Sequence, residues 1–111
     1  MKKKSTVQLE KDIEKYLKDE VAKIGGKAFK WISPGNRAVP DRICLLPKGN
    51  VIFVECKAPG KKPTLLQYKL HRILHLNGHE VVVVDTKEGI DDFIEVIKEE
   101  LKDEDNKDRN I

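Results

Sequence analysis

The sequence lacks the features that mark secreted, membrane-spanning and zinc-binding proteins. Its only two cysteines, Cys44 and Cys56, lie in predicted strands and provide neither a disulfide framework nor a zinc knuckle. No stretch approaches the roughly 18 apolar residues that a membrane-spanning helix needs. The initial MKKK is not followed by the apolar segment of a secretory signal. These absences favour a protein of the reducing cytoplasm.

Repeats, linkers and signs of a second domain are also missing. A chain of 111 residues can bury one hydrophobic core but not two. With 39% hydrophobic and 37% charged residues, its composition is that of a globular domain with a highly charged surface. We therefore expect a single domain over residues 1–102 and a charged C-terminal tail over residues 103–111.

The net charge of +3 is distributed unevenly along the chain. Residues 85–111 contain eleven acids and five bases, a net of −6, so the preceding 84 residues carry +9. A basic body of this kind indicates a polyanionic partner that meets one face of the protein.

Hydrophobic periodicity and turn residues predict three helices and four strands. The predicted elements are a helix at 6–24, strands at 27–32, 42–46 and 51–58, a helix at 64–78, a strand at 80–85 and a helix at 89–102. The order α-β-β-β-α-β-α indicates an α/β fold in which a mixed sheet is flanked by helices.

Three polar residues interrupt the second and third strands. Glu55 and Lys57 are two positions apart and point to the same side of their strand. The segment LPKGN predicts a type I turn that Gly49 completes in a left-handed conformation, as a three-residue hairpin loop. In that register Asp41 lies opposite Glu55, at a Cβ separation of about 5 Å.

Two facing carboxylates repel each other unless a cation joins them. Oxygen ligands of this kind suit Mg²⁺ or Mn²⁺, and Lys57 would lie beside the ion. The first helix adds another acid, because Glu10 falls inside its apolar arc, between Leu17 and Val21 around the helix axis. A carboxylate aimed at the core needs a partner or a function.

At this point the sequence resembles a known group of nucleases. PD at 40–41 and ECK at 55–57 match the PD-(D/E)XK pattern, and the flanking segments resemble the virus-type replication-repair nuclease (VRR-NUC) domain, with its restriction-endonuclease-like core. The resembling segments, in order, are LEKDIEKYL, GGKAFKW, SPGNRAVPDRI, FVECKAPGKKPT and LQ. One departure is Ala38, where the family usually has glycine.

The resemblance implies roles for individual residues. Asp41 and Glu55 would be metal ligands, assisted by the backbone carbonyl of Cys56. Lys57 would be the catalytic lysine. Glu10 would be the first-helix acid near the metal, acting through water, and Gln67 the catalytic-site glutamine of the following helix.

The resemblance also implies the activity: a Mg²⁺- or Mn²⁺-dependent DNA endonuclease that hydrolyses phosphodiester bonds with a metal-activated water. Stand-alone members resemble Holliday-junction resolvases, so branched DNA and a homodimer are the expected partners. Two alternatives stay open: a non-catalytic DNA-binding module, and the nuclease subunit of a larger restriction or repair complex.

Each site residue also has a simpler interpretation. Asp41 alone fits an ordinary turn acid, and Glu55 with Lys57 fits an ion pair on one strand face. Glu10 would merely flank the apolar stripe if the helix were rotated. Gln67 fits a capping box with Thr64. The functional interpretation depends on all these residues converging in one hollow.

The remaining polar residues have surface interpretations. His71, His75 and His79 recur every four residues, but the first two lie far from the apolar stripe of Leu66, Leu70 and Ile73, so we expect a solvated or DNA-facing surface rather than a metal site. Basic residues near the proposed site are expected to bind phosphates without reading sequence. The expected DNA contacts are Arg37, Arg42, Lys61, Lys62, Lys69 and Arg72.

Overall fold

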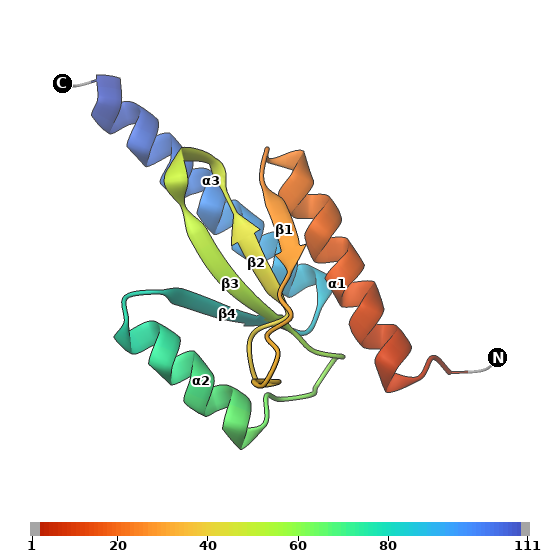
Figure 1. The fold of residues 1–111 in the computed structure, drawn as a ribbon. Helices are drawn as coiled ribbons and strands as arrows, with labels where there is room; N and C mark the ends of the chain where they lie inside the picture. Colours follow the sequence, from red (N-terminus) through yellow and green to blue (C-terminus); the bar gives the residue numbers. More distant parts are fainter. Residues whose placement is uncertain (1–2, 110–111) are drawn as a thin grey trace.

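The computed structural model describes residues 3–109. The predicted order of elements is confirmed (Figure 1). In chain order they are α1 (Thr6–Lys23), β1 (Lys27–Lys30), β2 (Arg42–Leu45), a 3-10 turn (Pro47–Gly49), β3 (Val51–Cys56), α2 (Leu65–Leu76), β4 (Glu80–Val84) and α3 (Lys87–Arg109). None of these helices is long and apolar enough to cross a membrane.

The four strands form one mixed sheet in the order β1-β2-β3-β4. The first three strands are antiparallel, and β4 pairs with β3 in parallel after the crossover through α2. Leu45 pairs with Val51, and the amide of Leu46 donates a 2.8 Å hydrogen bond to the carbonyl of Asn50. The hairpin loop therefore contains three residues, as predicted.

The type of turn in this loop differs from the prediction. A type I turn needs a negative φ at both central residues, but Lys48 has φ 64° and ψ 30°, and Gly49 follows with φ 78°. The Lys48 ammonium contacts the carbonyl of Leu101 and the carboxylate of Asp105. Lys48 therefore adopts a left-handed conformation, which is uncommon for residues other than glycine, while its side chain makes these two contacts with α3.

One face of the sheet forms the hydrophobic core with α1 and α3. Alternate strand residues point to this face and are buried; they are Ala28, Cys44, Ile52, Val54, Cys56 and Val84. Leu17 and Val21 of α1 and Ile90 of α3 have no exposed surface and pack against them. The two cysteines are buried in this core and are not bonded to each other.

The opposite face of the sheet is only partly covered. Figure 1 shows α2 beside β4, away from α1 and α3. Farther from α2, apolar side chains of this face stay open: Phe29, Leu45 and Val51 are 43%, 45% and 44% exposed. We call this side of the sheet the open face.

Helix α2 is rotated relative to the sequence prediction. The predicted inward stripe contained Leu66 and Ile73, but these side chains are 63% and 55% exposed. The less exposed positions are Gln67, Leu70, His71 and Leu74, which form one face at intervals of three and four. The prediction was wrong because it assumed an apolar contact, whereas the sheet presents the polar residue Glu55 to this helix.

Helix α3 extends beyond its predicted end at residue 102. The segment 103–109 has no glycine or proline to stop a helix, and the structure continues it to Arg109. Residues 110–111 lie outside the described part of the chain. The boundary between a domain at 1–102 and a tail at 103–111 stays a prediction.

Candidate active site

Asp41 and Glu55 meet where the β2–β3 hairpin opens. The β2–β3 ladder ends at the pair Arg42 and Val54. One residue beyond this pair on each chain segment lie Asp41 and Glu55. Since side chains alternate along a strand, both acids point to the open face. The backbone holds Asp41 there, because its Oδ2 accepts a 2.8 Å hydrogen bond from the N–H of Cys56.

Among the acids of the described residues, Glu55 differs from the others in burial, because its side chain has no exposed surface. Burial, reinforced by the neighbouring carboxylate of Asp41, raises the pKa of Glu55 to about 9. Within residues 3–109, neither of its carboxylate oxygens has a hydrogen-bond partner. Such a group is costly to bury unless a partner joins it.

Lys57 and Glu10 surround this pair electrostatically. Burial and Asp41 raise the pKa of Glu55, and the positive charge of Lys57 opposes this rise only in part. Burial raises the pKa of Glu10, an effect that Lys57 opposes and the Asp41 carboxylate reinforces. Helix α1 and the hairpin therefore bring three acids and one lysine into a single electrostatic group.

The donor set fits a small divalent cation. Mg²⁺ is commonly held by one or two carboxylates and keeps several waters, and two buried oxygens of Glu55 without partners suit that role. Within the described residues, no group of three or more His, Cys, Asp or Glu side chains lies close enough to hold a metal. The arrangement therefore suits an ion held by Asp41, Glu55 and backbone oxygen rather than a cage of side chains.

Comparisons with known proteins agree with this geometry. Over 79 residues the chain is 56% identical to "Putative nuclease p44" of Acyrthosiphon pisum secondary endosymbiont phage 1, covering 71% of this chain and 85% of that protein. A solved VRR-NUC domain superposes with a TM-score of 0.74 at 32% identity, covering 78% of this chain and 94% of that one. The chain belongs to the VRR-NUC family of nuclease domains. No family model matches it.

The departure at Ala38 does not distort this VRR-NUC domain. Within the described residues, Lys48 is the only residue other than glycine with a positive φ, so Ala38 adopts a conformation open to any L-residue. Its side chain is buried, and its N–H donates a 3.2 Å hydrogen bond to the side chain of Asn36. The loop before Asp41 therefore accepts alanine.

Gln67 forms the capping box that its spacing predicted. Its side-chain oxygen accepts a 2.8 Å hydrogen bond from the amide of Thr64, whose hydroxyl accepts one of 3.2 Å in return. This contact fixes the start of α2 and, with it, the face that the helix turns toward the sheet. Its role at the reacting centre stays a prediction.

His71 is the residue that the sequence interpretation missed. It was expected on a solvated or DNA-facing surface, but its side chain is only 11% exposed and its Nε2 lies 3.5 Å from Oε2 of Glu55. Burial and the charge of Lys57 lower the pKa of the imidazole. A signal was present, since His71 lies one turn after Gln67 and therefore on the same helix face.

Within the described residues, the three histidines do not form one metal-binding cluster. The ring of His79 packs edge-on against Phe53 at 5.6 Å, and Phe53 in turn lies 5.2 Å from the ring of Trp31. His75 lines a shallow hollow between α2 and β4 together with Tyr68, His71, Arg72 and Val81. The interval of four residues therefore does not bring the three imidazoles together.

Most of the predicted DNA-binding residues are exposed. The exposed residues are Arg37, Lys61, Lys62, Lys69 and Arg72. Arg42 differs, because its Nε donates a 3.0 Å hydrogen bond to Glu14 and its Nη1 donates one to the carbonyl of Ala28. Both side chains of this ion pair are about five-sixths buried, at 16% and 17% exposed, so Arg42 ties α1 to the sheet.

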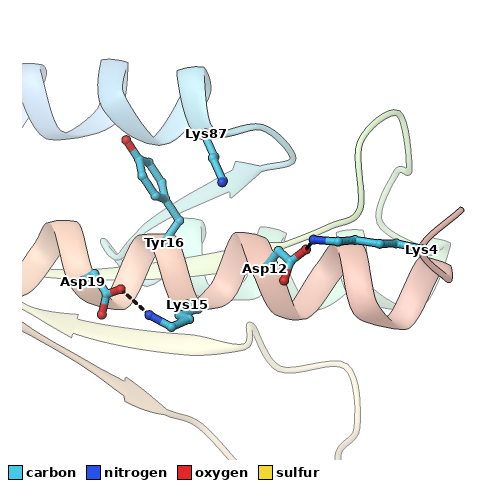
Figure 2. A pocket seen from close by; sticks show the side chains of 6 residues that line it. All are labelled: Lys4, Asp12, Lys15, Tyr16, Asp19 and Lys87. Carbon is cyan, nitrogen blue, oxygen red and sulfur yellow. Dashed lines mark hydrogen bonds and ion pairs between the residues drawn. The ribbon is translucent and has the colours of Figure 1, made fainter. Parts of the chain in front are cut away.

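A second hollow lies between α1 and α3 and is lined by none of the residues of the acidic pair. Figure 2 shows its lining: Lys4, Asp12, Lys15, Tyr16, Asp19 and Lys87. Lys4 pairs with Asp12, Lys15 pairs with Asp19, and Tyr16 donates a 2.6 Å hydrogen bond to Asp91. The Lys87 ammonium lies over the ring of Tyr16. Because the two aspartates of this hollow are paired with lysines, it is a useful place for control substitutions.

Proposed function

We propose that the protein is a Mg²⁺- or Mn²⁺-dependent DNA endonuclease whose active site is built on Asp41, Glu55 and Lys57. The observation that carries this proposal is the buried Glu55 carboxylate without a hydrogen-bond partner in residues 3–109, next to the anchored carboxylate of Asp41. Membership of the family supports nuclease activity. The pair of carboxylates supports binding of the divalent ion that phosphodiester hydrolysis commonly uses.

Each site residue has a defined task in this mechanism. Asp41, Glu55 and the backbone carbonyl of Cys56 would hold the ion. When bound, the ion acts as a Lewis acid that lowers the pKa of water and neutralises negative charge on the phosphate. Lys57 orients the attacking water and offsets the negative charge that develops on the phosphate oxygens. Glu10 would bind the ion through a water molecule.

The DNA backbone approaches from the side of α2 and the two loops that flank the site. Arg37 lies in the loop before Asp41, whereas Lys61 and Lys62 lie in the loop after Lys57. Exposed lysine and arginine side chains bind phosphates without reading base sequence. Together with Lys69 and Arg72 on α2, they position the strand rather than select a sequence.

We further propose that two copies associate and cut branched DNA in the manner of a Holliday-junction resolvase. The open face supports this step, because Leu45 and Val51 are paired neighbours that expose apolar surface beside Phe29. Contiguous apolar patches of this kind commonly mark protein interfaces. A dimer would present two sites to the opposed strands of a junction.

The activity is tested by incubating synthetic four-way junctions, flaps and plain duplexes with the protein and Mg²⁺. We expect junction cleavage, and we expect Asp41→Asn and Glu55→Gln each to abolish it. If both variants cut as well as the unsubstituted protein, the assignment of the site is wrong. DNA binding without cleavage of any substrate would instead favour a non-catalytic binding module.

The dimer is tested separately by sedimentation at several protein concentrations. Val51→Lys is expected to yield monomers, whereas Val96→Lys, at a 57% exposed position on α3, is expected to leave the dimer intact. A monomeric unsubstituted protein at high micromolar concentration would refute this step but leave the cleavage chemistry unaffected.

A further inference from the structure

His71 and Glu55 form a buried polar contact between α2 and β3. The imidazole Nε2 lies 3.5 Å from Glu55 Oε2, and the two side chains are 11% and 0% exposed. Three atoms of this contact, both Glu55 oxygens and His71 Nε2, are buried without a hydrogen-bond partner in the described residues. Buried polar atoms are rarely left unpaired in proteins, so this contact needs an explanation.

The position of His71 is fixed from several sides. The capping box of Gln67 sets the start of α2, and His71 follows one turn later on the same face. The ring of Tyr68 lies edge-on to the imidazole at 6.3 Å. Leu70 and Leu74 flank it on the sheet side of the helix. The imidazole therefore lies on the helix face that α2 turns toward Glu55.

The two acids of the site differ in how they are held. Asp41 already accepts a hydrogen bond from the Cys56 N–H, which leaves its other oxygen for an ion. Glu55 has no such backbone donor in the described residues. A carboxylate that binds a metal through one oxygen is typically oriented by a hydrogen bond to the other. His71 is the side chain close enough to provide that bond.

We propose that His71 is a positioning residue whose Nε2–H donates to Oε2 of Glu55, so that the other carboxylate oxygen of Glu55 faces the divalent ion. This inference rests on the proposed function. The Cys56 amide and the His71 imidazole then play equivalent roles, one for each carboxylate. His71 acts through Glu55 and does not itself contact DNA.

The test measures binding of Mn²⁺ alone to the DNA-free protein, by electron paramagnetic resonance. Glutamine and methionine have similar length, but only glutamine can donate a hydrogen bond near the position of Nε2. His71→Met is expected to weaken Mn²⁺ binding about 10- to 100-fold, and His71→Gln to retain it within about threefold. His75→Met, at an exposed position on the same helix, serves as the control and is expected to bind normally.

A second measurement needs no substitution. In the Mg²⁺-saturated protein, long-range ¹H–¹⁵N NMR spectra are expected to show the proton of His71 on Nε2. An unprotonated Nε2 would mean that the imidazole does not donate to Glu55, and it would overturn the proposal. This measurement also decides the question if His71→Met does not fold, as judged by circular dichroism.

The outcomes separate this inference from the proposed function. If the unsubstituted protein binds no Mn²⁺, both the proposed metal site and the proposed role of His71 are refuted. If it binds Mn²⁺ and His71→Met binds equally well, the role of His71 alone is refuted. Equal loss in the Gln and Met variants would make the imidazole a direct ligand and would also overturn the positioning role.

Discussion

Asp41 and Glu55 come from the two arms of one hairpin and meet one register step beyond the Arg42–Val54 pair. Asp41 is anchored by the amide of Cys56, and Glu55 is completely buried. The hairpin register alone brings these acids together, although fourteen positions separate them in the sequence. The chemistry of the site follows from this contact and from the charges around it.

Lys57 is expected to serve the reaction rather than metal binding. Lys57→Met should lower the cleavage rate on the order of 10²-fold or more, because it removes a charge that stabilises the developing phosphate charge. Mn²⁺ binding should be retained, since the lysine contributes no ligand. Rates are measured under single-turnover conditions and Mn²⁺ affinity by calorimetry, with Lys15→Met, in the hollow of Figure 2, as the exposed control. Parallel loss of binding and cleavage would contradict this division of roles.

The metal-free protein is expected to lose stability as the pH rises. The pKa of Glu55 is 4.5 in the unfolded reference and about 9 in the folded protein, so the folded state binds more protons between these values. The free energy of unfolding therefore falls with rising pH across this window. Urea denaturation in EDTA should show this slope, and Glu55→Gln should flatten it. The slope should also shrink when saturating Mg²⁺ replaces EDTA, because the ion stabilises the ionised carboxylate.

A Glu55→Gln variant with the same pH dependence as the unsubstituted protein would refute this assignment. The loss of stability would then have to arise from other groups, and Glu55 would not be the acid that carries the additional proton.

DNA affinity is expected to depend steeply on salt and on the basic residues near the site. Lys61→Ala, Lys69→Ala and Arg72→Ala should each weaken binding to all DNA sequences similarly and reduce the slope of log K against log salt by about 1. Fluorescence anisotropy in EDTA measures binding without cleavage. Lys15→Ala, in the hollow of Figure 2, is the control and should leave the slope unchanged. An equal effect of Lys15→Ala would place the DNA on a different face.

The turn that sets the hairpin register is expected to tolerate alanine at moderate cost. Gly49 has φ 78° with open space around the position of a Cβ, so Gly49→Ala should cost about 1 kcal/mol of stability through backbone strain alone. Gly26→Ala should cost more, because its Cβ would lie 2.7 Å from the carbonyl oxygen of Leu45. Urea denaturation of both variants checks the order, and Gly26→Ala as the milder change would contradict it.

The sequence predicted the features that depend on local chemistry. The segment LPKGN determined a three-residue loop, and the loop determined the register that joins Asp41 to Glu55. Thr64 and Gln67 formed their capping box because both partners lie within one helical turn. The turn type was missed, since the left-handed conformation of Lys48 accompanies contacts with α3, more than fifty residues away in the chain.

The rotation of α2 could not be predicted from its apolar residues. Leucine periodicity indicated one inward face, whereas the structure turns His71 toward a buried acid on β3. The ion pair of Arg42 was likewise not predicted, because nothing near Arg42 in the sequence identifies Glu14 as its partner. Both cases depend on contacts between distant segments, and hydrophobic periodicity carries no information about them.

The central claim is that Asp41 and Glu55 hold one divalent ion together. Crystals grown with Mn²⁺, with diffraction measured near the manganese absorption edge, test it most directly. We predict an anomalous peak about 2.2 Å from one oxygen of each carboxylate. A peak elsewhere, with the oxygens of Glu55 still unpaired, would contradict the account.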